Sequence, residues 1–310
     1  MARAGAAIVT WNSEGQLGPC LEALRRHGVR QIVVVDNASR DGTVEEARRF
    51  GASQLIVNPW NRGFAGALNQ AIEIIESPLV LVINPDCELL GGLDALEQAC
   101  AQPSVAATGG KLLDGLGRPQ VGFMVRRFPT PAALALEVLG INRLWWANPV
   151  NRRYRCLDLD PEQPGEVEQP AGAFLMVRRQ VWRELGGFAE CFHPLWFEDV
   201  DWLLRAARAG YRIRYEPRAV ARHRGAGSIS KLGWEERQWY WYDSLFRFAG
   251  RHFRPLEYRI LLAVAEVGFA LRGAGGIRQA GGAALRVYGR IMRLAAKEFM
   301  LAARKRGHWR

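Results

Sequence analysis

Apolar and amphipathic segments alternate along the first hundred residues. The apolar runs have the length of β-strands and cover residues 6–10, 31–36, 53–57 and 78–83. Segments with the spacing of amphipathic helices lie between them, at residues 14–27, 41–50 and 63–76. Strands that alternate with helices indicate a parallel sheet with crossover helices, so the pattern predicts a doubly wound α/β fold.

The regular alternation ends near residue 110, where glycine and proline begin to mark turns and loops. The pattern then predicts a strand over 171–177, a helix to residue 185, a helix over 199–209, and strands over 211–215 and 218–222. We expect these elements to complete a first domain over residues 1–231. A separate helical segment is expected over residues 232–310.

Charge is distributed unevenly between these two parts. The chain of 310 residues has a formal net charge of +11. Residues 232–310 hold 15 Lys and Arg against 6 Asp and Glu, so this segment carries +9 and the remainder carries only +2. A basic tail suits an anionic membrane surface, a phosphorylated lipid or a nucleic acid, because each offers dense negative charge.

The last helical segment is amphipathic. Its basic residues recur at helical steps and share one face: Arg286, Arg290, Arg293, Lys297 and Arg304. Its apolar residues share the opposite face: Val287, Tyr288, Ile291, Ala295 and Phe299. Two interpretations stay open, namely a solvated charged face on a helix packed against the body, or a helix that lies in a membrane interface. No apolar run reaches the length needed to cross a bilayer, since Glu266 interrupts the nearest one, at residues 260–271.

The five cysteines are scattered and odd in number, which argues against a disulfide framework or a zinc site. A reducing, cytoplasmic compartment fits this usage. The apolar segment after the N-terminus is interrupted at Asn12, too early for a signal peptide.

Polar residues follow several of the predicted strands. Thr10, Asp36, Asn58 and Asn84 stand where four of these strands end. In an open α/β sheet, ligands bind outside the carboxyl ends of the strands, so these positions predict a binding site. Taken singly, each is also an ordinary turn or cap residue.

Seven short segments together resemble the family 2 glycosyltransferases of the GT-A fold, especially their rhamnosyltransferase-like branch. They are Val9-Thr10-Trp11-Asn12, residues 34–43 (VVDNASRDGT), residues 61–69 (NRGFAGALN), Ile83-Asn84-Pro85-Asp86, Gly172-Ala173-Phe174, Gly186-Gly187-Phe188 and Phe197-Glu198-Asp199-Val200-Asp201. The resemblance spans residues 6–224 and implies a Rossmann-like, doubly wound mixed sheet, followed here by the helical basic tail.

The resemblance implies a nucleotide-sugar site at the strand ends. Asp36 corresponds to the acid that accepts a hydrogen bond from the pyrimidine base of the donor, with Thr10 beside it. The remaining donor-binding positions on these motifs are Asn12, Asn37, Asn61, Arg62, Gly63, Asn84 and Asp86. The turn at Asn61-Arg62-Gly63 begins a helix and suits diphosphate or ribose oxygens.

A metal site is also implied. Asn84-Pro85-Asp86 takes the place of the family's Asp-x-Asp motif, so Asp86 is the one full charge available to Mg²⁺ or Mn²⁺. His223 corresponds to a histidine that completes the metal or diphosphate site, and the glycine-rich segment 225–228 to a mobile loop. Cys87, next to Asp86, is interpreted as a buried apolar residue.

The resemblance also implies a catalytic base in the acidic segment that begins the helix at residue 199. An inverting transfer needs a carboxylate to take the proton of the acceptor hydroxyl. In the family the second acid of this motif is that base, which corresponds to Asp199. The acceptor-binding residues would then be Glu198, Trp196 and Gly172, and further tryptophans such as Trp145, Trp146, Trp234, Trp239 and Trp241 are candidates for an aromatic platform.

The implied enzyme is an inverting hexosyltransferase of cell-surface polysaccharide synthesis, with dTDP-rhamnose as the first choice of donor and UDP-sugars next. The expected acceptor is a glycan or lipid-linked glycan, reached by peripheral contact with an anionic membrane; no nucleic-acid partner is expected. Two alternatives stay open. A sugar nucleotidyltransferase would need a glycine-rich basic loop after the first strand, where this chain has Trp11-Asn12-Ser13-Glu14. A non-catalytic membrane or nucleic-acid binding module would depend on the basic tail.

Overall fold

The computed structural model describes residues 4–225, 227, 229–280 and 282–304, and for residues 273–280, 303 and 304 the backbone only. The chain divides into two compact units. Unit 1 comprises Met1–Phe128 and Arg155–Lys231, and unit 2 comprises Pro129–Tyr154 and Leu232–Arg310. The second segment of unit 1 ends at Lys231. Residues 129–154, which the sequence pattern places in the first domain, belong to unit 2, because their first helix packs along a C-terminal helix.

Unit 1 is built on one mixed sheet. Its first half alternates strands and helices: β1 (Ala4–Thr10), α1 (Leu17–Arg26), β2 (Ile32–Asp36), α2 (Thr43–Arg49), β3 (Gln54–Val57), α3 (Gly63–Ile74) and β4 (Leu79–Ile83). The strands lie in the order β3-β2-β1-β4 and are parallel, as predicted. Thr10 is the register partner of Asp36, so both residues reach the same edge of the sheet.

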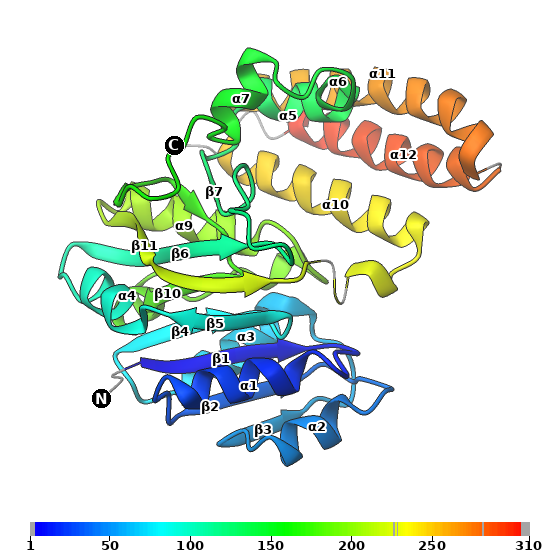
Figure 1. Ribbon diagram of the computed structural model, residues 1–310. Coiled ribbons are helices and arrows are strands. Elements are labelled where there is room, and N and C mark those ends of the chain that lie inside the picture. Colours follow the sequence, from blue (N-terminus) through cyan, green and yellow to red (C-terminus); the bar gives the residue numbers. More distant parts are fainter. Residues whose placement is uncertain (1–3, 226, 228, 281, 305–310) are drawn as a thin grey trace. The chain divides into compact units, whose positions relative to one another are not determined.

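Successive side chains of a strand point to opposite faces of the sheet, and here both faces are buried. On β1, Ala6 and Ile8 pack into the cluster that contains residues of α1, α2 and α4. Ala7 and Val9 pack into the cluster that contains residues of α3, α8 and α9. Helices therefore cover both faces, with α1 and α2 on one side and α3 on the other (Figure 1), which confirms the doubly wound fold.

The second half of unit 1 extends the sheet with antiparallel and parallel neighbours. Its elements are β5 (Cys87–Gly91), α4 (Leu93–Cys100), β6 (Val105–Leu113), β7 (Val125–Arg126), β8 (Gly165–Glu166), β9 (Gln169–Pro170), β10 (Phe174–Arg178), α8 (Arg179–Glu184), a 3-10 turn (Glu190–Phe192), α9 (Glu198–Arg208), β11 (Arg212–His223) and a 3-10 turn (Ile229–Lys231). Beyond β4 the order continues β10-β6-β11-β5. The two strands predicted over 211–215 and 218–222 form the single strand β11, since a register shift against β6 between Glu216 and Val220 accommodates Pro217.

Unit 2 consists of helices. They are α5 (Pro131–Leu139), α6 (Ile141–Leu144), α7 (Pro149–Tyr154), α10 (Trp234–His252), α11 (Pro255–Ala280) and α12 (Gly282–Arg304). The helices α11 and α12 pack side by side, α5 packs on α11, and α10 packs on both (Figure 1). In the described part of the chain, no helix is both long enough and apolar enough to span a bilayer.

The apolar face predicted on the last helix is used inside unit 2. Val287, Tyr288, Ile291 and Ala295 of α12 are buried against the neighbouring helices. The Tyr288 ring stacks on that of Phe269 of α11, with ring centroids 5.9 Å apart. The interpretation of α12 as a helix that inserts this face into a membrane is therefore wrong, and its basic side is a solvated face.

Candidate functional site

The candidate site lies at the carboxyl edge of the parallel strands of unit 1. Strand β1 has β2 on one side and β4 on the other, so the order of connections changes direction at β1. In doubly wound sheets, such a switch point forms a crevice outside the strand ends, where ligands bind. Thr10, Asp36 and Asn84 end or follow the three strands at this place, as the sequence predicts.

Asp36 is buried and already bonded within the protein. Its Oδ1 accepts hydrogen bonds from the Thr10 hydroxyl at 3.0 Å and from the Ser39 hydroxyl. Its Oδ2 accepts one from the Ser39 backbone N–H at 2.9 Å. Because a carboxylate offers about four lone-pair positions, Oδ2 keeps an acceptor position for a ligand. Thr10 therefore orients the carboxylate and does not compete with a ligand for it.

Asn12 and Asn37 hold the surrounding turns. The Asn12 backbone N–H donates to the Ser39 hydroxyl, and its side-chain oxygen accepts from the Arg40 N–H, at 2.7 and 2.8 Å. The Asn37 side chain donates to the Gly63 carbonyl at 3.0 Å and accepts from the Arg62 N–H at 3.3 Å. The side-chain groups of Asn37 are thus used to fix the turn before α3.

That turn presents Arg62 to solvent. The Asn61 side-chain oxygen accepts from the Gly63 N–H at 2.8 Å. Gly63 has a positive φ of 78° and lies against His193 and Pro194, where a Cβ atom would come within 2.8 Å of the imidazole. The Arg62 side chain is exposed and has no partner among the described residues, so it remains available to an anionic group.

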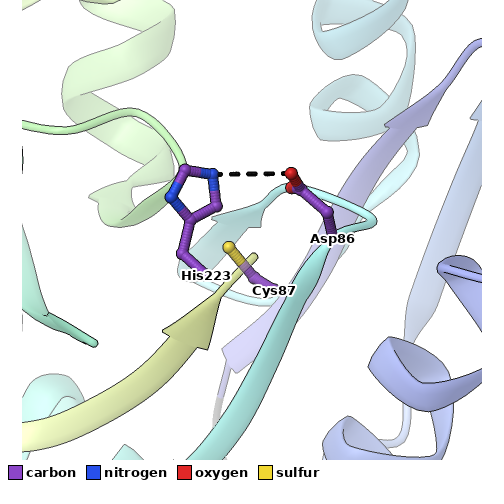
Figure 2. A group of neighbouring side chains, drawn as sticks. All are labelled: Asp86, Cys87 and His223. Atoms are coloured by element: carbon purple, nitrogen blue, oxygen red, sulfur yellow. Dashed lines mark ion pairs between the residues drawn. The ribbon is translucent and has the colours of Figure 1, made fainter. Parts of the chain in front are cut away.

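Asp86 and His223 form the centre of the predicted metal site. Asp86 follows β4, and His223 ends β11, which pairs with β5 directly after Asp86. Both are buried, and Nε2 of His223 lies 3.6 Å from Oδ2 of Asp86, as Figure 2 shows. The same Oδ2 accepts a weak hydrogen bond from the Gly227 N–H at 3.4 Å. Asn84 stands nearby, half-buried, with its backbone bonded to Ala173 and Cys87. Of segment 225–228, Ala226 and Ser228 lie outside the described residues.

The hydrogen bonds of Gln120 fix the tautomer of His223. The side-chain N–H of Gln120 donates to the His223 carbonyl at 3.1 Å, which fixes the orientation of the amide. Its oxygen therefore faces Nδ1 of His223, at 3.0 Å, and an amide oxygen only accepts. The proton must be on Nδ1, which leaves the Nε2 lone pair directed toward Asp86. Burial lowers the pKa of His223, although Asp86 opposes this, and favours the neutral ring that binds metals.

These donors fit a hard divalent cation. One carboxylate oxygen and one imidazole nitrogen converge, and phosphate oxygens of a nucleotide can complete such a site. Cys87 belongs to the same cluster, with its thiol near both groups (Figure 2). Its thiol donates to the Ala173 carbonyl at 3.3 Å, and burial together with Asp86 raises its pKa well above the usual range. A protonated, soft thiol is a poor ligand for Mg²⁺ or Mn²⁺, which agrees with its interpretation as an apolar residue.

Replacing Gln120 tests this arrangement. Without the amide, His223 loses the acceptor that fixes its tautomer, so Gln120→Ala should lower Mn²⁺ affinity by about 10- to 100-fold. Gln120→Glu keeps an acceptor at Nδ1 and should retain most of the affinity. Isothermal titration with Mn²⁺ in the presence of deoxythymidine diphosphate, without any sugar, measures both. Equal affinity of the Ala variant and the parent protein would show that Gln120 does not position the histidine.

Asp199, the predicted base, lies in the first turn of α9, and two backbone N–H groups hold its carboxylate. Its Oδ2 accepts from Gly172 at 3.1 Å and its Oδ1 from Val200 at 2.8 Å. A Cβ atom on residue 172 would come within 2.8 Å of Oδ2, so glycine is required for this approach. Gly172, predicted to bind the acceptor, thus uses its N–H to orient Asp199. Each oxygen keeps a second acceptor position for a hydroxyl group.

The environment of Asp199 suits a general base. Burial raises its pKa, while the N–H groups of Val200 and Gly172 and the positive charge of Arg126 act against this shift. A base works best when its pKa approaches the working pH, because it must be both charged and basic. The neighbouring Glu198 is buried, and burial followed by the charge of Asp199 raises its pKa well above the usual range.

The buried carboxyl group of Glu198 lowers the stability of the folded protein at neutral and higher pH. One of its carboxyl oxygens is buried and has no hydrogen-bond partner among the described residues. Because its folded-state pKa is raised, the native state binds its proton more tightly, and stability declines as the pH rises above the pKa of the unfolded chain. Glu198→Gln should therefore raise Tm at pH 8 by about 2 °C or more, with the gain vanishing near about pH 4. Differential scanning calorimetry at both pH values measures this, with exposed Glu22→Gln as the control; a lower Tm at pH 8 would contradict it.

Backbone strain and an ion pair set the position of this acidic segment. Trp196 and Phe197 both have positive φ, 77° and 71°, which is unusual for aromatic residues. Trp196 is half-buried, two residues before Glu198. Within α9, the buried Asp201 accepts from Nε of Arg205 at 2.8 Å. Arg205 also donates to the Leu185 and Gly187 carbonyls, so this pair ties α9 to the segment before it.

The sequence pattern did not indicate three residues in the segment that runs from the end of β6 through β7. Gln120 holds His223, whose ring stacks on Phe123 with centroids 5.2 Å apart. The Arg126 guanidinium lies over Phe123, 5.6 Å from the centroid, and its charge acts on Asp199. This segment thus connects the metal cluster with the base. Nothing in its spacing indicates such a role, because it follows a turn and its partners are about a hundred residues away. The tryptophans proposed as a platform, apart from Trp196, are in unit 2.

Comparisons with known proteins identify the family of this chain. The family model described as Glycosyl transferase family 2 matches residues 6–104. The N-acetylglucosaminyl-diphospho-decaprenol L-rhamnosyltransferase of Mycobacterium tuberculosis is 30% identical over 215 residues, which cover 64% of this chain and 68% of that protein. The chain belongs to glycosyltransferase family 2.

This glycosyltransferase is also similar to two further proteins. The O-antigen chain rhamnosyltransferase RfbN of Salmonella typhimurium is 24% identical over 232 residues, 70% of this chain and 64% of that protein. A mannosyltransferase from Pyrobaculum calidifontis, solved with GDP-Man and Mn²⁺, has a TM-score of 0.52 and 21% identity, over 99% of this chain and 87% of that one. The expected GT-A fold is thereby confirmed. As a member of the family this glycosyltransferase is an enzyme, which excludes both alternatives, the sugar nucleotidyltransferase and the non-catalytic module.

Proposed function

We propose that this glycosyltransferase transfers L-rhamnose from dTDP-rhamnose, with inversion, to a lipid-linked glycan in cell-surface polysaccharide synthesis. The observation that carries the reaction type is the half-buried Asp199 carboxylate, which two backbone N–H groups orient and which retains free acceptor positions. The choice of donor draws on two relatives that are named rhamnosyltransferases. UDP-sugars are the next candidates.

Asp199 removes the proton of the acceptor hydroxyl while that oxygen attacks the anomeric carbon from the side opposite the diphosphate. No covalent sugar-enzyme intermediate is needed, so the configuration at that carbon inverts. The positive charge of Arg126 lowers the pKa of Asp199, whereas burial raises it. Arg126 thus favours the charged carboxylate that the base requires. Glu198, buried beside it, forms a hydrogen bond with the acceptor sugar.

The donor occupies the strand edge. Asp36, oriented by Thr10 and Ser39, accepts the N–H of a pyrimidine base, which suits thymine and uracil alike. Asp86 and the Nε2 atom of His223 would hold Mg²⁺ or Mn²⁺, and the bound cation neutralises the charge of the diphosphate. The mannosyltransferase of similar fold was solved with Mn²⁺, which supports a metal of this kind. Exposed Arg62 supplies a further positive charge at the same edge.

The acceptor is proposed from the name of the mycobacterial relative, which specifies a sugar on a diphospho-decaprenol lipid. A lipid-linked acceptor places the reaction at the cytoplasmic face of a membrane. The net charge of +9 in residues 232–310 supports peripheral contact with anionic lipids there.

A panel of nucleotide sugars tests the function. We expect dTDP-rhamnose with Mn²⁺ to raise Tm more than UDP-, GDP- or ADP-sugars do, because a ligand that binds only the native state stabilises it. Transfer to a synthetic polyprenyl-diphosphate sugar should then give a product whose anomeric configuration, read by NMR, is opposite to that of the donor. Stabilisation by a UDP-sugar alone would identify that sugar nucleotide as the donor in place of dTDP-rhamnose. Retention of configuration would exclude Asp199 as the base of a direct displacement.

A further inference from the structure

A thiol lies beside the two residues proposed to hold the catalytic cation. A carboxylate oxygen of Asp86, the sulfur of Cys87 and a ring nitrogen of His223 lie within 4.8 Å of one another, and all three residues are buried (Figure 2). Strand pairing explains this arrangement, because Cys87 of β5 is the register partner of His223 of β11, and Asp86 directly precedes Cys87. Side chains of directly opposite residues lie on the same face of a sheet. The pairing therefore brings one carboxylate, one imidazole and one thiol together.

This set of donors has the chemistry of a zinc site. Zn²⁺ binds Cys, His and Asp side chains in tetrahedral geometry, and sites with three protein ligands leave the fourth position open. Thiolates select ions such as Zn²⁺, whereas carboxylate, carbonyl and water oxygens suit Mg²⁺ and Mn²⁺. With a hard cation, the Cys87 thiol thus stays outside the coordination sphere. With Zn²⁺ it can enter.

The distances between the donors require little movement. Two nitrogen or oxygen ligands of a tetrahedral zinc lie about 3.4 Å apart, close to the 3.6 Å between Nε2 of His223 and Oδ2 of Asp86. The sulfur must come within about 3.6 Å of both atoms, which takes a displacement of about 1 Å. Cys87 then gives up its hydrogen bond to the Ala173 carbonyl. That carbonyl keeps the Asn84 N–H as a donor, at 3.0 Å.

His223 already has the orientation that a zinc ligand needs. Its Nδ1–H donates to the side-chain oxygen of Gln120 at 3.0 Å, so the Nε2 lone pair is directed toward Asp86. Metal-bound histidines almost always donate their second ring N–H to an acceptor, which fixes the ring and raises its basicity. This hydrogen bond does not involve Cys87. It is therefore a separate observation in favour of metal binding by this ring.

We propose that Asp86, Cys87 and His223 bind Zn²⁺ in the absence of nucleotide, with Cys87 as the ligand that selects zinc over Mg²⁺ and Mn²⁺. The thiol proton passes to solvent as the sulfur–zinc bond forms, because a coordinated thiol is deprotonated. Mg²⁺ and Mn²⁺ instead need phosphate oxygens of the donor to complete their coordination. The scattered cysteines of the sequence do not indicate this site, since only one of its ligands is a thiol.

Zn²⁺ bound by these three residues inhibits sugar transfer, because it occupies the position of the catalytic cation. This consequence rests on the proposed function of Asp86 and His223, whereas Zn²⁺ binding itself does not. Loss of an outer-shell partner already costs about 10- to 100-fold in metal affinity, so loss of the thiolate should cost about 100-fold or more. Cys87→Ala should therefore need about 100-fold more Zn²⁺ for the same inhibition of Mn²⁺-dependent transfer.

Co²⁺ is a spectroscopic probe of the zinc site that requires no activity. A Co²⁺–thiolate bond gives an intense charge-transfer absorption in the near ultraviolet, which oxygen and nitrogen ligands do not give. We expect this absorption when Co²⁺ is added to the reduced full-length protein without nucleotide, and its loss when Zn²⁺ is added afterwards. Cys87→Ala should abolish it. The control Cys191→Ser removes an exposed thiol instead and should retain it.

Metal affinities give a second readout. In competition with a chromophoric chelator, Cys87→Ala should weaken Zn²⁺ binding by about 100-fold or more. Its Mn²⁺ affinity in the presence of deoxythymidine diphosphate should change little, because a hard ion does not use the thiol. Cys87 is buried, so Tm without metal shows whether the variant is folded, and the Co²⁺ spectrum of the parent protein decides the proposal without any variant.

Two results would overturn the zinc site. One is the absence of the charge-transfer absorption from the parent protein. The other is an absorption that Cys191→Ser removes and Cys87→Ala retains, which would assign the metal to the exposed thiol. Both measurements omit the nucleotide sugar, so either result would leave the proposed transfer reaction standing. Conversely, failure of transfer from dTDP-rhamnose would not change the Co²⁺ spectrum.

Discussion

Asp199→Asn should lower kcat by about 10²- to 10⁴-fold while leaving the affinity for the donor nearly unchanged. The amide cannot take the proton of the acceptor hydroxyl. The donor is proposed to bind at Asp36, at the end of β2, and at Asp86, in the turn after β4, whereas Asp199 is in α9, so donor affinity should not depend on this side chain. Single-turnover kinetics with saturating donor, together with calorimetric titration of the nucleotide diphosphate, separate the two effects. A variant with full activity would exclude Asp199 as the base.

A neighbouring carboxylate on the same helix provides the control. Asp201 is buried and paired with Arg205, so Asp201→Asn should lower Tm but leave kcat of the folded enzyme largely intact.

The pH profile adds a readout that a structural role would not change. Because the base must be charged, kcat should fall as the pH decreases through the raised pKa of Asp199. Arg126→Gln removes a charge that lowers this pKa, so the acid limb should shift to higher pH. An unshifted limb would show that Arg126 does not act on the base.

Asp86→Asn should lower donor affinity in the presence of Mn²⁺ by about 10³-fold, because it removes the only carboxylate among the proposed ligands to the cation. Turnover at subsaturating donor should fall in parallel. His223 alone is a weak site for a hard cation, which prefers oxygen. Chelation of the metal by EDTA should reduce donor affinity in the parent protein to the level of the variant, measured by titration with dTDP-rhamnose.

The control for this change is Asp94→Asn, the same substitution at an exposed position in the first turn of α4. It should leave both metal and donor affinity unchanged. If Asp86 instead serves only the fold through its contact with His223, Asp86→Asn would lower Tm without metal and the response to EDTA would remain. That result would remove Asp86 from the metal site.

Local pattern was sufficient for the core of unit 1. The strands and helices over residues 4–83 match the predicted segments to within a few residues, because β1, β2 and β4 are buried on both faces and are therefore apolar runs, and the helices keep their apolar spacing. The gathering of Thr10, Asp36 and Asn84 also follows from the pattern, since neighbouring parallel strands end at the same edge. Pairing of β11 with β5 brings His223 to Asp86, which only the motif resemblance could anticipate.

Other features of the site depend on contacts between distant residues. Gln120 acts on a residue 103 positions away, and Gly172 orients Asp199 through a backbone N–H that carries no sequence signal beyond the absence of a side chain. In unit 2 the amphipathic pattern of α12 correctly predicts which residues are apolar and which are basic. It does not tell whether protein or lipid covers the apolar side.

The sequence by itself therefore predicted the parallel half of the sheet, the edge where its polar residues gather and the acidic residues of the candidate site, because these follow from burial along single elements and from short motifs. Only the tertiary structure decided that Gln120 fixes the tautomer of His223, that Gly172 serves Asp199, and that other helices cover the apolar side of α12. The physical reason is that a hydrogen bond or a buried helix face needs residues from two segments that are far apart in the sequence. Which segments meet is decided by the packing of the whole chain.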